Sequence, residues 1–342
     1  MRFLVTGGAG FIGSHLVEYL AGEGHEVVVL DDFSTGKREN LDGVHSKIEI
    51  IEGTITDLAT CTRACRGVDF VFHEAALASV PRSLRDPLAT HHVNTTGTLN
   101  VLLAARDTGV RRVVYAASSS AYGNTAELPK HETMVAKPLS PYAVSKLTGE
   151  QYCRACTASF GVETVALRYF NIFGARQDPN SQYAAVVPKF ITAAQASESP
   201  VIFGDGEQTR DFTFVANAVR ANMLACIAPA QGCCGEVFNV GCGTRISVNE
   251  LWRRIAALLE CDAHPQYVPA RSGDVRDSLA SLERSHRALG YSPAVSIADG
   301  LRRTVEWYTL RKALADASNR SVVAPADERD QERLPNAQQV AV

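Results

Sequence analysis

Tyr142 and Lys146 are the two residues whose types and spacing most directly suggest acid–base chemistry. Residues four apart lie on one face of a helix, and Pro141 directly before the pair favours a helix start there. An ammonium group beside a tyrosine favours the phenolate, so we expect Lys146 to lower the pKa of Tyr142 from near 10. Ser118 follows an apolar strand candidate, where its hydroxyl could hydrogen-bond the same substrate oxygen as Tyr142. Taken alone, the pair would also fit an ordinary half-exposed amphipathic helix.

A glycine motif, TGGAGFIG at residues 6–13, joins a strand candidate to a helix candidate. Gly7, Gly10 and Gly13 permit a tight turn, close approach of the backbone to a pyrophosphate, and close helix–strand packing. Free N–H groups at the helix start would face the phosphates. Asp31 ends the next strand, where a carboxylate accepts bonds from ribose hydroxyls and repels a 2′-phosphate. The combination predicts a dinucleotide site that takes NAD rather than NADP.

Elements that would position these residues alternate along the first half of the chain. The strand candidates are Arg2–Thr6, Glu26–Leu30, Ile48–Glu52, Phe70–His73, Arg112–Ala116 and Thr164–Arg168. The helix candidates are Phe11–Gly22, Thr95–Thr108 and Tyr142–Phe160. Continuous apolar strands separated by helices predict an α/β fold, a Rossmann-type doubly wound parallel sheet covered on both faces. Ligands bind at the carboxyl ends of such strands, where the glycine turn, Ser118 and Tyr142 would meet.

The alternation loosens after about residue 170, where prolines and glycines break up the chain. Val201–Phe203 is a short strand candidate, and Phe212–Val215 and Val237–Val240 resemble further strands of the main sheet. We expect an NAD-binding domain of residues 1–170 plus about 212–241. A smaller mixed α/β substrate domain would take about 171–211 plus 242–312. The polar segment 313–342 has little apolar periodicity, which predicts a disordered tail.

The composition is that of a globular protein: 342 residues, 46% hydrophobic and 21% charged, with a net charge of −3. This balance argues against a basic nucleic-acid-binding protein, and no apolar run approaches the roughly 20 residues that span a membrane. The N-terminus lacks the apolar region of a signal peptide. The nine cysteines show no paired metal-ligand spacing. We therefore expect a cytoplasmic protein with free thiols, without a metal site and without nucleic-acid or membrane partners.

Taken together, the motifs resemble the extended short-chain dehydrogenase/reductase family. The matching segments are TGGAGFIG at 6–13, DDFSTG at 31–36, HEAA at 73–76, SSSAYG at 118–123, YAVSK at 142–146 and RYFNIFG at 168–174. The resemblance covers about residues 1–310. It implies Tyr142 as catalytic acid/base, Lys146 on the nicotinamide ribose and Ser118 as hydroxyl partner. Glu74 departs from the pattern, because the family usually has an apolar residue there.

The resemblance also implies which residues hold NAD. These are Gly7, Gly10, Phe11, Ile12, Gly13, Asp31, Asp32, Ser34, Thr35, Gly36, Asp57, Leu58, Ala75, Asn94, Lys146 and Tyr169. Among them, Asp57 and Leu58 follow the third strand candidate and are expected at the adenine edge. Asp57 could equally cap a helix, since aspartate is a favoured N-cap residue.

Ser119 and Ser120, the residues after Ser118, help to separate branches of the family. The sugar dehydratases carry an acidic pair beside the catalytic hydroxyl, and the decarboxylases carry a glutamate nearby. Serine cannot do that acid–base work at neutral pH. The cysteine and histidine of the 3,5-epimerase/reductases are also missing from Ser118–Gly123. Of the reactions known for the family, oxidation and re-reduction at one carbon is the one left. The second half of the chain looks like that of the UDP-sugar 4-epimerases.

The residues implied to contact a UDP-sugar are Ser79, Arg82, Ser83, Ser118, Ser119, Tyr142, Asn171, Val187, Val201, Phe203, Arg210, Arg271, Asp274 and Ser278. Arg210 and Arg271 offer forked donors to phosphate oxygens, although each alone would also fit a solvated surface charge. Segments 79–83 and 174–190 look like those of UDP-GlcNAc 4-epimerases. Ser278 stands where glucose-restricted enzymes carry a bulky tyrosine, which leaves room for a 2-acetamido group.

Alternatives to that substrate stay open. Ser79, Arg82 and Ser83 could instead face a C6 carboxylate, as in a UDP-glucuronate or UDP-N-acetylglucosaminuronate 4-epimerase. A non-catalytic NAD-binding regulator is a more distant alternative, because such proteins typically lose the tyrosine or the lysine. The helices at 95–108 and 142–160 resemble the family's four-helix interface and suggest a homodimer.

Overall fold

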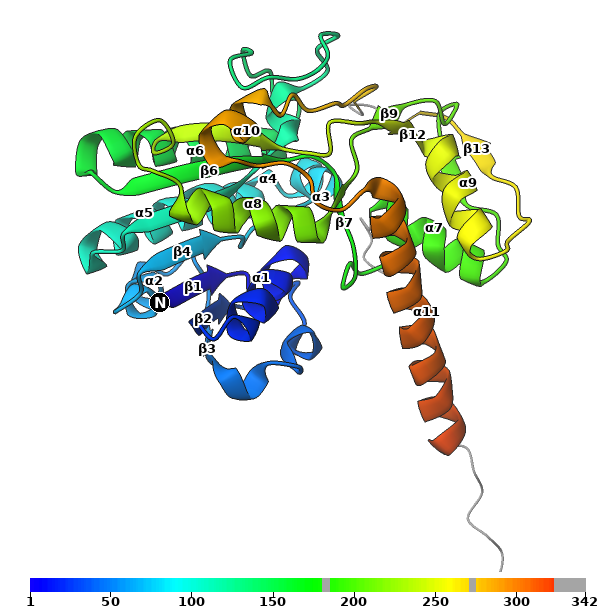
Figure 1. The fold of residues 1–342 in the computed structure, drawn as a ribbon, viewed down its shortest axis with the longest axis horizontal. Helices are drawn as coiled ribbons and strands as arrows, with labels where there is room; N and C mark the ends of the chain where they lie inside the picture. The colour runs from blue at the N-terminus through cyan, green and yellow to red at the C-terminus, as the bar shows by residue number, and fades with distance from the viewer. Residues whose placement is uncertain (180–184, 271–274, 323–342) are drawn as a thin grey trace, which may run out of the picture.

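The computed structural model describes residues 1–179, 185–270 and 275–322 (Figure 1). Its centre is a seven-stranded sheet in the order β11-β6-β5-β4-β1-β2-β3, in which every pair is parallel. The strands are β1 (Arg2–Thr6), β2 (Glu26–Asp31), β3 (Ile48–Glu52), β4 (Phe70–His73), β5 (Arg112–Ser118), β6 (Glu163–Tyr169) and β11 (Glu236–Val240). The predicted doubly wound sheet is confirmed. Strand order reverses between β1 and β4, and ligands bind beside such a reversal in open α/β sheets.

Helices cover both faces of the sheet and bury its apolar strands in two layers. One layer includes α1 (Phe11–Gly22) and α8 (Val215–Ile227), and the other includes α2 (Leu58–Cys65), α5 (Gly97–Thr108) and α6 (Pro141–Phe160). Strands covered on both sides read as continuous apolar runs, which is why the sequence located them. A π-helical turn (His92–Thr96) precedes α5, so this helix begins two residues later than expected. Short helices α3 (Val80–Arg85), α4 (Pro87–His91) and α10 (Glu283–Leu289) complete this lobe.

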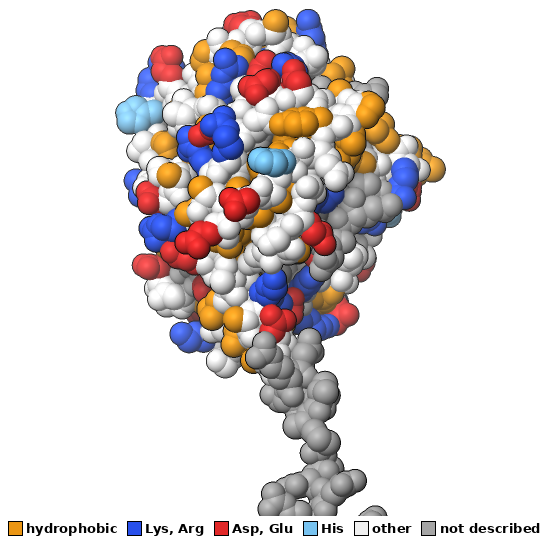
Figure 2. Space-filling model, turned by 90° about the vertical axis from the view of Figure 1, so that its right-hand side faces the viewer, with side chains coloured by type: hydrophobic (Ala, Val, Ile, Leu, Met, Phe, Trp, Pro, Cys, Tyr) orange, Lys and Arg blue, Asp and Glu red, His pale blue; other side chains and the backbone are white. Residues whose placement is uncertain are grey.

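A second lobe has its own apolar core. It contains α7 (Val186–Gln195), β8 (Val201–Phe203), β9 (Thr209–Arg210), β12 (Ile246–Ser247), α9 (Val248–Leu258), β13 (Gln266–Val268) and α11 (Ile297–Val322). Strand β8 pairs with β13 and β9 pairs with β12, while Phe190 packs edge-on against Trp252 between α7 and α9. Figure 2 shows basic and acidic side chains interspersed over the face that this lobe presents. In the described part of the chain, no helix is long and apolar enough to cross a membrane.

Two expectations about the second half need correction. Phe212–Val215 is not a strand of the main sheet: only Thr213–Phe214 (β10) is extended, and it pairs with β7 (Ile172–Phe173) in a separate two-stranded sheet. Val215 already begins α8, because the following residues bury one helical face against the main sheet. The helix α11 continues to Val322, ten residues into the segment expected to be disordered. Residues 323–342 lie outside the described residues.

Candidate active site

The glycine turn lies between β1 and α1 and packs against the loop after β4. Gly7 has a φ of +68°, and a Cβ there would lie 2.8 Å from the Ala75 nitrogen. A Cβ on Gly13 would lie 2.1 Å from the Gly7 carbonyl oxygen. Neither contact is possible for a larger residue without moving the backbone. The turn therefore brings the N-terminus of α1, with its free N–H groups, close to the carboxyl ends of β1 and β4.

A cleft of about 740 Å³ opens beside this turn, a size typical of cofactor sites. The expected cofactor residues that line it are Gly7, Gly10, Phe11, Ile12, Gly13, Asp31, Asp32, Ser34, Thr35, Gly36 and Ala75. Its other wall includes Arg176, Gln177 and Asp178, which follow β7. An ion pair of 3.3 Å between Lys37 Nζ and Asp178 Oδ2 joins the two walls.

Asp31 occupies the end of β2 as predicted, and backbone groups hold its carboxylate. One oxygen accepts from the Ala9 N–H and the other from the Phe33 N–H, each at 2.8 Å. A Cβ on Gly36 would lie 2.8 Å from this carboxylate, so the small residue is required. Burial raises the pKa of Asp31, and the two backbone N–H groups oppose the rise. Each oxygen keeps a further lone pair for a ribose hydroxyl, so the cleft fits a dinucleotide without a 2′-phosphate.

Several expected cofactor residues do not line the cleft. Asp57 is exposed and caps α2, accepting from the N–H groups of Ala59 and Thr60, and Leu58 follows it in the helix. Asn94 is fully buried and bonds the Leu77 backbone and the Ser145 hydroxyl, so it braces the cleft wall from behind. Lys146 and Tyr169 are buried and are not among the residues that line the cleft. Gly53 and Ile55 line the cleft near β3, and the sequence reasoning missed both.

Ser118, Tyr142 and Lys146 come together at the carboxyl end of β5. Tyr142 is the second residue of α6, whose start is fixed by Pro141 and by the Ser140 side chain. Lys146 is buried one turn later, and its Nζ donates to the Ala116 carbonyl at 2.7 Å. Ser118 ends β5, and its hydroxyl oxygen accepts from the Ser120 hydroxyl at 2.8 Å. The half-buried Ser119 follows in the same turn.

The expected direction of the Tyr142 pKa is wrong for the protein alone. Burial raises this pKa, and hydrogen bonding with Ser118 opposes the rise. Lys146 is not among the groups that shift this pKa, and burial lowers the pKa of Lys146 itself to about 8. The principal group that opposes this lowering is Glu74, the residue for which the sequence offered no account. Glu74 lines the cleft and accepts from the Tyr169 hydroxyl at 2.7 Å.

Residues expected to contact a sugar nucleotide are spread over both lobes. Ser79 and Arg82 line the cleft, and the Ser79 hydroxyl caps α3 by accepting from the Arg82 N–H. Ser83 is buried and donates to the Val80 carbonyl, so its hydroxyl is engaged within α3. Val187 is buried in the core of the second lobe, whereas Val201 is about half exposed.

Asn171 and Ser278 meet although they are distant in sequence. The Asn171 side-chain nitrogen donates to the Asp211 carbonyl at 3.1 Å and lies 3.5 Å from the Ser278 hydroxyl. Asn171 has a φ of +37°, so the backbone leaves the direction of β6 at this residue. Ser278 is 9% exposed and its N–H bonds to the Thr209 carbonyl. This contact joins the end of the main sheet to the segment that follows residue 274.

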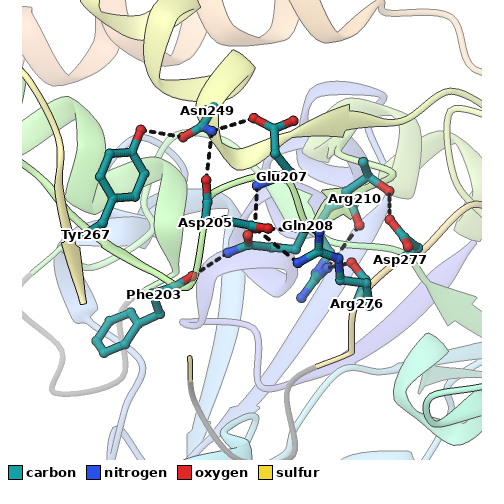
Figure 3. Close-up of polar contacts among 10 residues, drawn as sticks. Phe203, Asp205, Glu207, Gln208, Arg210, Asn249, Tyr267, Arg276 and Asp277 are labelled. Carbon is teal, nitrogen blue, oxygen red and sulfur yellow. Dashed lines mark hydrogen bonds and ion pairs between the residues drawn. The ribbon is translucent and has the colours of Figure 1, made fainter. Parts of the chain in front are cut away.

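A network of charged and polar side chains surrounds β8 and β9 (Figure 3). The Asp205 carboxylate accepts hydrogen bonds from the two terminal guanidinium nitrogens of Arg276, at 3.0 and 3.1 Å. Arg210 donates to the carbonyls of Thr209 and Arg276. The Phe203 ring points away from this network while its carbonyl accepts from Gln208.

The sequence reasoning missed Asp205 and Arg276, because 71 positions separate them and neither lies in a recognisable motif. It named Arg271 and Asp274, which lie outside the described residues.

The model of the NAD dependent epimerase/dehydratase family matches residues 3–241. Among curated relatives, the UDP-glucose 4-epimerase of Mycolicibacterium smegmatis is 41% identical over 312 residues, covering 90% of this chain and 98% of its own. The structure of the Thermotoga maritima UDP-glucose 4-epimerase with UDP-glucose has a TM-score of 0.86 at 38% identity, covering 92% of this chain and 100% of that one. The UDP-N-acetylglucosamine 4-epimerase of Methanobrevibacter ruminantium, in complex with UDP-N-acetylmuramic acid, has a TM-score of 0.86 at 39% identity, covering 91% and 98%.

The matched region contains the glycine turn and Asp31, which line the cleft, and Ser118 and the Tyr142–Lys146 pair, which meet at the carboxyl end of β5. The expected extended short-chain dehydrogenase/reductase relationship and the expected NAD cofactor are thereby confirmed. The chain belongs to the NAD dependent epimerase/dehydratase family and is an NAD-dependent enzyme.

Proposed function

We propose that this enzyme inverts the C4 hydroxyl of a UDP-hexose through a transient 4-keto sugar. The observation that carries the proposal is the meeting of Ser118, Tyr142 and Lys146 at the carboxyl end of β5, next to the cleft of the glycine turn. NAD held in that cleft would accept a hydride from C4 and return it to the opposite face of the ring. The protein then has to move one proton on and off the C4 oxygen.

Tyr142 is the residue we assign to that proton. Its phenolic oxygen takes the hydroxyl proton as the C4 carbonyl forms, and returns it when the carbonyl is reduced. The Ser118 hydroxyl orients the same substrate oxygen by hydrogen bonding. Burial raises the pKa of Tyr142, so the phenolate needs a positive charge nearby. In the loaded enzyme we assign that charge to Lys146, one turn further along α6.

Two observations favour epimerisation over the other reactions of the family. Ser119 and Ser120 follow Ser118 without a carboxyl group, so dehydration or decarboxylation lacks its acid–base residue there. The relatives from M. smegmatis and T. maritima are both named UDP-glucose 4-epimerases, and the similarity covers nearly the whole of their chains.

For the sugar, we propose UDP-GlcNAc and UDP-GalNAc. Ser278 lies beside Asn171 and is small at the position where the family resemblance expects a bulky tyrosine in glucose-restricted enzymes. The M. ruminantium relative is named a UDP-N-acetylglucosamine 4-epimerase. A uronic acid substrate is the second candidate, because Arg82 lines the cleft and carries a charge that suits a C6 carboxylate. UDP-glucose is the third, since the M. smegmatis and T. maritima relatives are named for it.

The test is a panel of UDP-glucose, UDP-GlcNAc, UDP-glucuronate and UDP-N-acetylglucosaminuronate, each followed by NMR for C4 inversion. The proposal expects the highest kcat/KM for UDP-GlcNAc. A preference for either uronic acid would replace the substrate assignment and keep the reaction, whereas inversion of none of them would contradict both.

We also propose that the protein forms a homodimer through α5 and α6. Leu88 on α4 and Val144 on α6 are 81% and 49% exposed, which gives this side of the main lobe an uncovered apolar surface. Light scattering on Val144→Glu should then show a shift from dimer to monomer.

A further inference from the structure

The ammonium group of Lys146 lies over the ring of Tyr115, a side chain of β5 that the proposed chemistry does not use. Lys146 Nζ is 5.0 Å from the ring centroid. An aromatic face attracts a cation at distances up to roughly 6 Å. The same Nζ donates to the carbonyl of Ala116, the next residue of β5, at 2.7 Å. Tyr115 is 1% exposed and Lys146 is 4% exposed, so little water screens this attraction.

Contacts with two neighbouring elements hold the Tyr115 ring in this place. Its hydroxyl donates to the Lys146 carbonyl at 3.3 Å. Gly149, on the next turn of α6, lets the helix approach the ring, because a Cβ there would lie 2.2 Å from the Tyr115 hydroxyl oxygen. On β4, the centroid of the His73 ring lies 5.5 Å from that of Tyr115. In a packed interior the ring can leave Lys146 only if α6 or β4 moves.

Burial works against the positive charge of Lys146 and lowers its pKa to about 8. Among the charged side chains near it, Glu74 opposes this lowering most. Glu74 follows β4 and accepts from the Tyr169 hydroxyl, and burial raises the pKa of Glu74 to about 7. Its negative charge is therefore incomplete at neutral pH, and Lys146 gains less from it than from a fully ionised carboxylate.

The other titratable groups that act on Lys146 carry little net charge. Glu150 on α6 is matched by Arg168, whose guanidinium donates to both carboxylate oxygens at 2.8 and 2.7 Å. Cys153 on the same helix is a neutral thiol, because burial raises its pKa. His73 on β4 is neutral, because burial lowers its pKa to about 3. The Tyr115 ring thus attracts the ammonium without bringing a further charged group into the site.

We propose that Tyr115 is a positioning residue of the active site, whose ring holds the Lys146 ammonium at the carboxyl end of β5 and stabilises its positive charge. The face of the ring attracts the ammonium and not the neutral amine. A charged Lys146 is what the Tyr142 phenolate requires, so the contact supports the proton step assigned above. The catalytic part of this inference rests on the proposed function, whereas the contact itself is testable without a substrate.

NMR of protein labelled with 13C at the lysine Cε reports the charge of Lys146 directly, and the signal lost in Lys146→Arg identifies it. Tyr115→Leu removes the ring, and Lys146 should then titrate about one pH unit lower than in the wild type. Tyr115→Phe keeps the ring and should titrate like the wild type. An unchanged or raised midpoint in Tyr115→Leu would overturn the proposal.

Tyr291→Leu is the matched control for loss of a buried tyrosine. Tyr291 is 0% exposed, and its hydroxyl also donates to a backbone carbonyl, that of Gly241, at 2.8 Å. It belongs to the apolar core on the other face of the sheet, so Lys146 should titrate as in the wild type. An equal fall of the midpoint in both leucine variants would assign the effect to a loosened core and would refute the role of the Tyr115 ring.

Fluorinated phenylalanines in place of Tyr115 keep a ring of nearly the same shape and guard against a folding defect in Tyr115→Leu. Fluorine withdraws charge from the face of the ring and weakens its attraction for a cation. Relative to Tyr115→Phe, the Lys146 midpoint should therefore fall stepwise as fluorines are added. A midpoint that does not depend on the number of fluorines would exclude attraction by the ring face.

Kinetics separate the contact from its use in catalysis. Tyr115 is not among the residues that line the cleft, so Tyr115→Leu should leave KM for UDP-GlcNAc nearly unchanged. Its kcat at pH 8 should fall about fivefold, because a lower pKa loses the ammonium earlier as the pH rises. A wild-type kcat in this variant would contradict the catalytic part of the proposal. Absence of C4 inversion by the wild type would contradict the proposed function and would alter none of the NMR results.

Discussion

The cofactor cleft and the second lobe are held in place by different kinds of groups. The cleft uses glycines, short side chains and backbone N–H groups at the ends of neighbouring parallel strands; the carboxylate of Asp31, for example, is held by the N–H groups of Ala9 and Phe33. The second lobe uses long charged side chains on loops, such as the pair Asp205–Arg276, whose side chains are more than half exposed. The first region tolerates almost no change in backbone position. The second can rearrange, since exposed ion pairs contribute little to stability.

Tyr142 lies beside Ser118 at the carboxyl end of β5, and its loss should have the largest effect. Tyr142→Phe should lower kcat by on the order of 10²- to 10⁴-fold, the usual range for a lost general acid or base. NAD content, read from the absorbance of the purified protein, should be unchanged because Tyr142 does not line the cleft. Tyr19→Phe, at an exposed position on α1, is the control. Wild-type turnover by Tyr142→Phe would remove this residue from the chemistry.

Gly13 tests how rigid the cofactor region is. A methyl group at Gly13 would lie 2.1 Å from the Gly7 oxygen, so Gly13→Ala must move the turn itself. We expect NAD affinity to fall by about a hundredfold, as overpacking costs about 1–3 kcal/mol. Gly22→Ala in the last turn of the same helix meets nothing within 4 Å and should bind NAD like wild type. Fluorescence titration with NAD measures the affinity of both variants. Equal affinities would mean that the glycine turn can shift to accept a methyl group without loss of binding.

Ser278 tests whether the substrate region sets selectivity. Ser278→Tyr should lower kcat/KM for UDP-GlcNAc at least about tenfold, because the ring would occupy space needed by the acetamido group. UDP-glucose, with a hydroxyl at C2, should be nearly unaffected. Assays of both sugars on one preparation separate this effect from misfolding. Parallel losses would exclude Ser278 from the sugar site and remove the main support for an N-acetylated substrate.

Substitution of Asp57 should have the smallest effect. It tests whether this residue only caps α2 or also contacts the cofactor. The side chain caps α2, so Asp57→Ala should lower Tm by less than about 4 °C while NAD affinity stays at the wild-type value. Asp57→Asn keeps a capping group and should restore Tm. A clear loss of NAD affinity in both variants would instead support the adenine contact expected from the sequence.

The contrast between the regions also explains what the sequence could predict. The sheet and glycine turn follow from local patterns, since a buried parallel strand is a continuous apolar run and a tight turn needs glycines at fixed spacing. Glu74 stood out in the sequence as a departure from the family pattern, but its interactions with Lys146 and Tyr169 arise only in the folded chain. The Tyr142 pKa was misjudged because burial, which no local pattern reveals, raises it and Lys146 does not oppose the rise. Thr213–Phe214 (β10) was misplaced because the pattern of a two-residue strand is too short to show which sheet it joins.

The central claim is a C4 oxidation whose hydride never leaves the enzyme. The most direct measurement is NMR of the reaction with UDP-GlcNAc in D2O without added cofactor, with NADH absorbance followed in parallel. The account predicts a mixture of the two C4 epimers in which C4 keeps its original hydrogen, with no net NADH. Deuterium at C4 would contradict it by showing exchange with solvent, and steady accumulation of NADH would show a dehydrogenase instead.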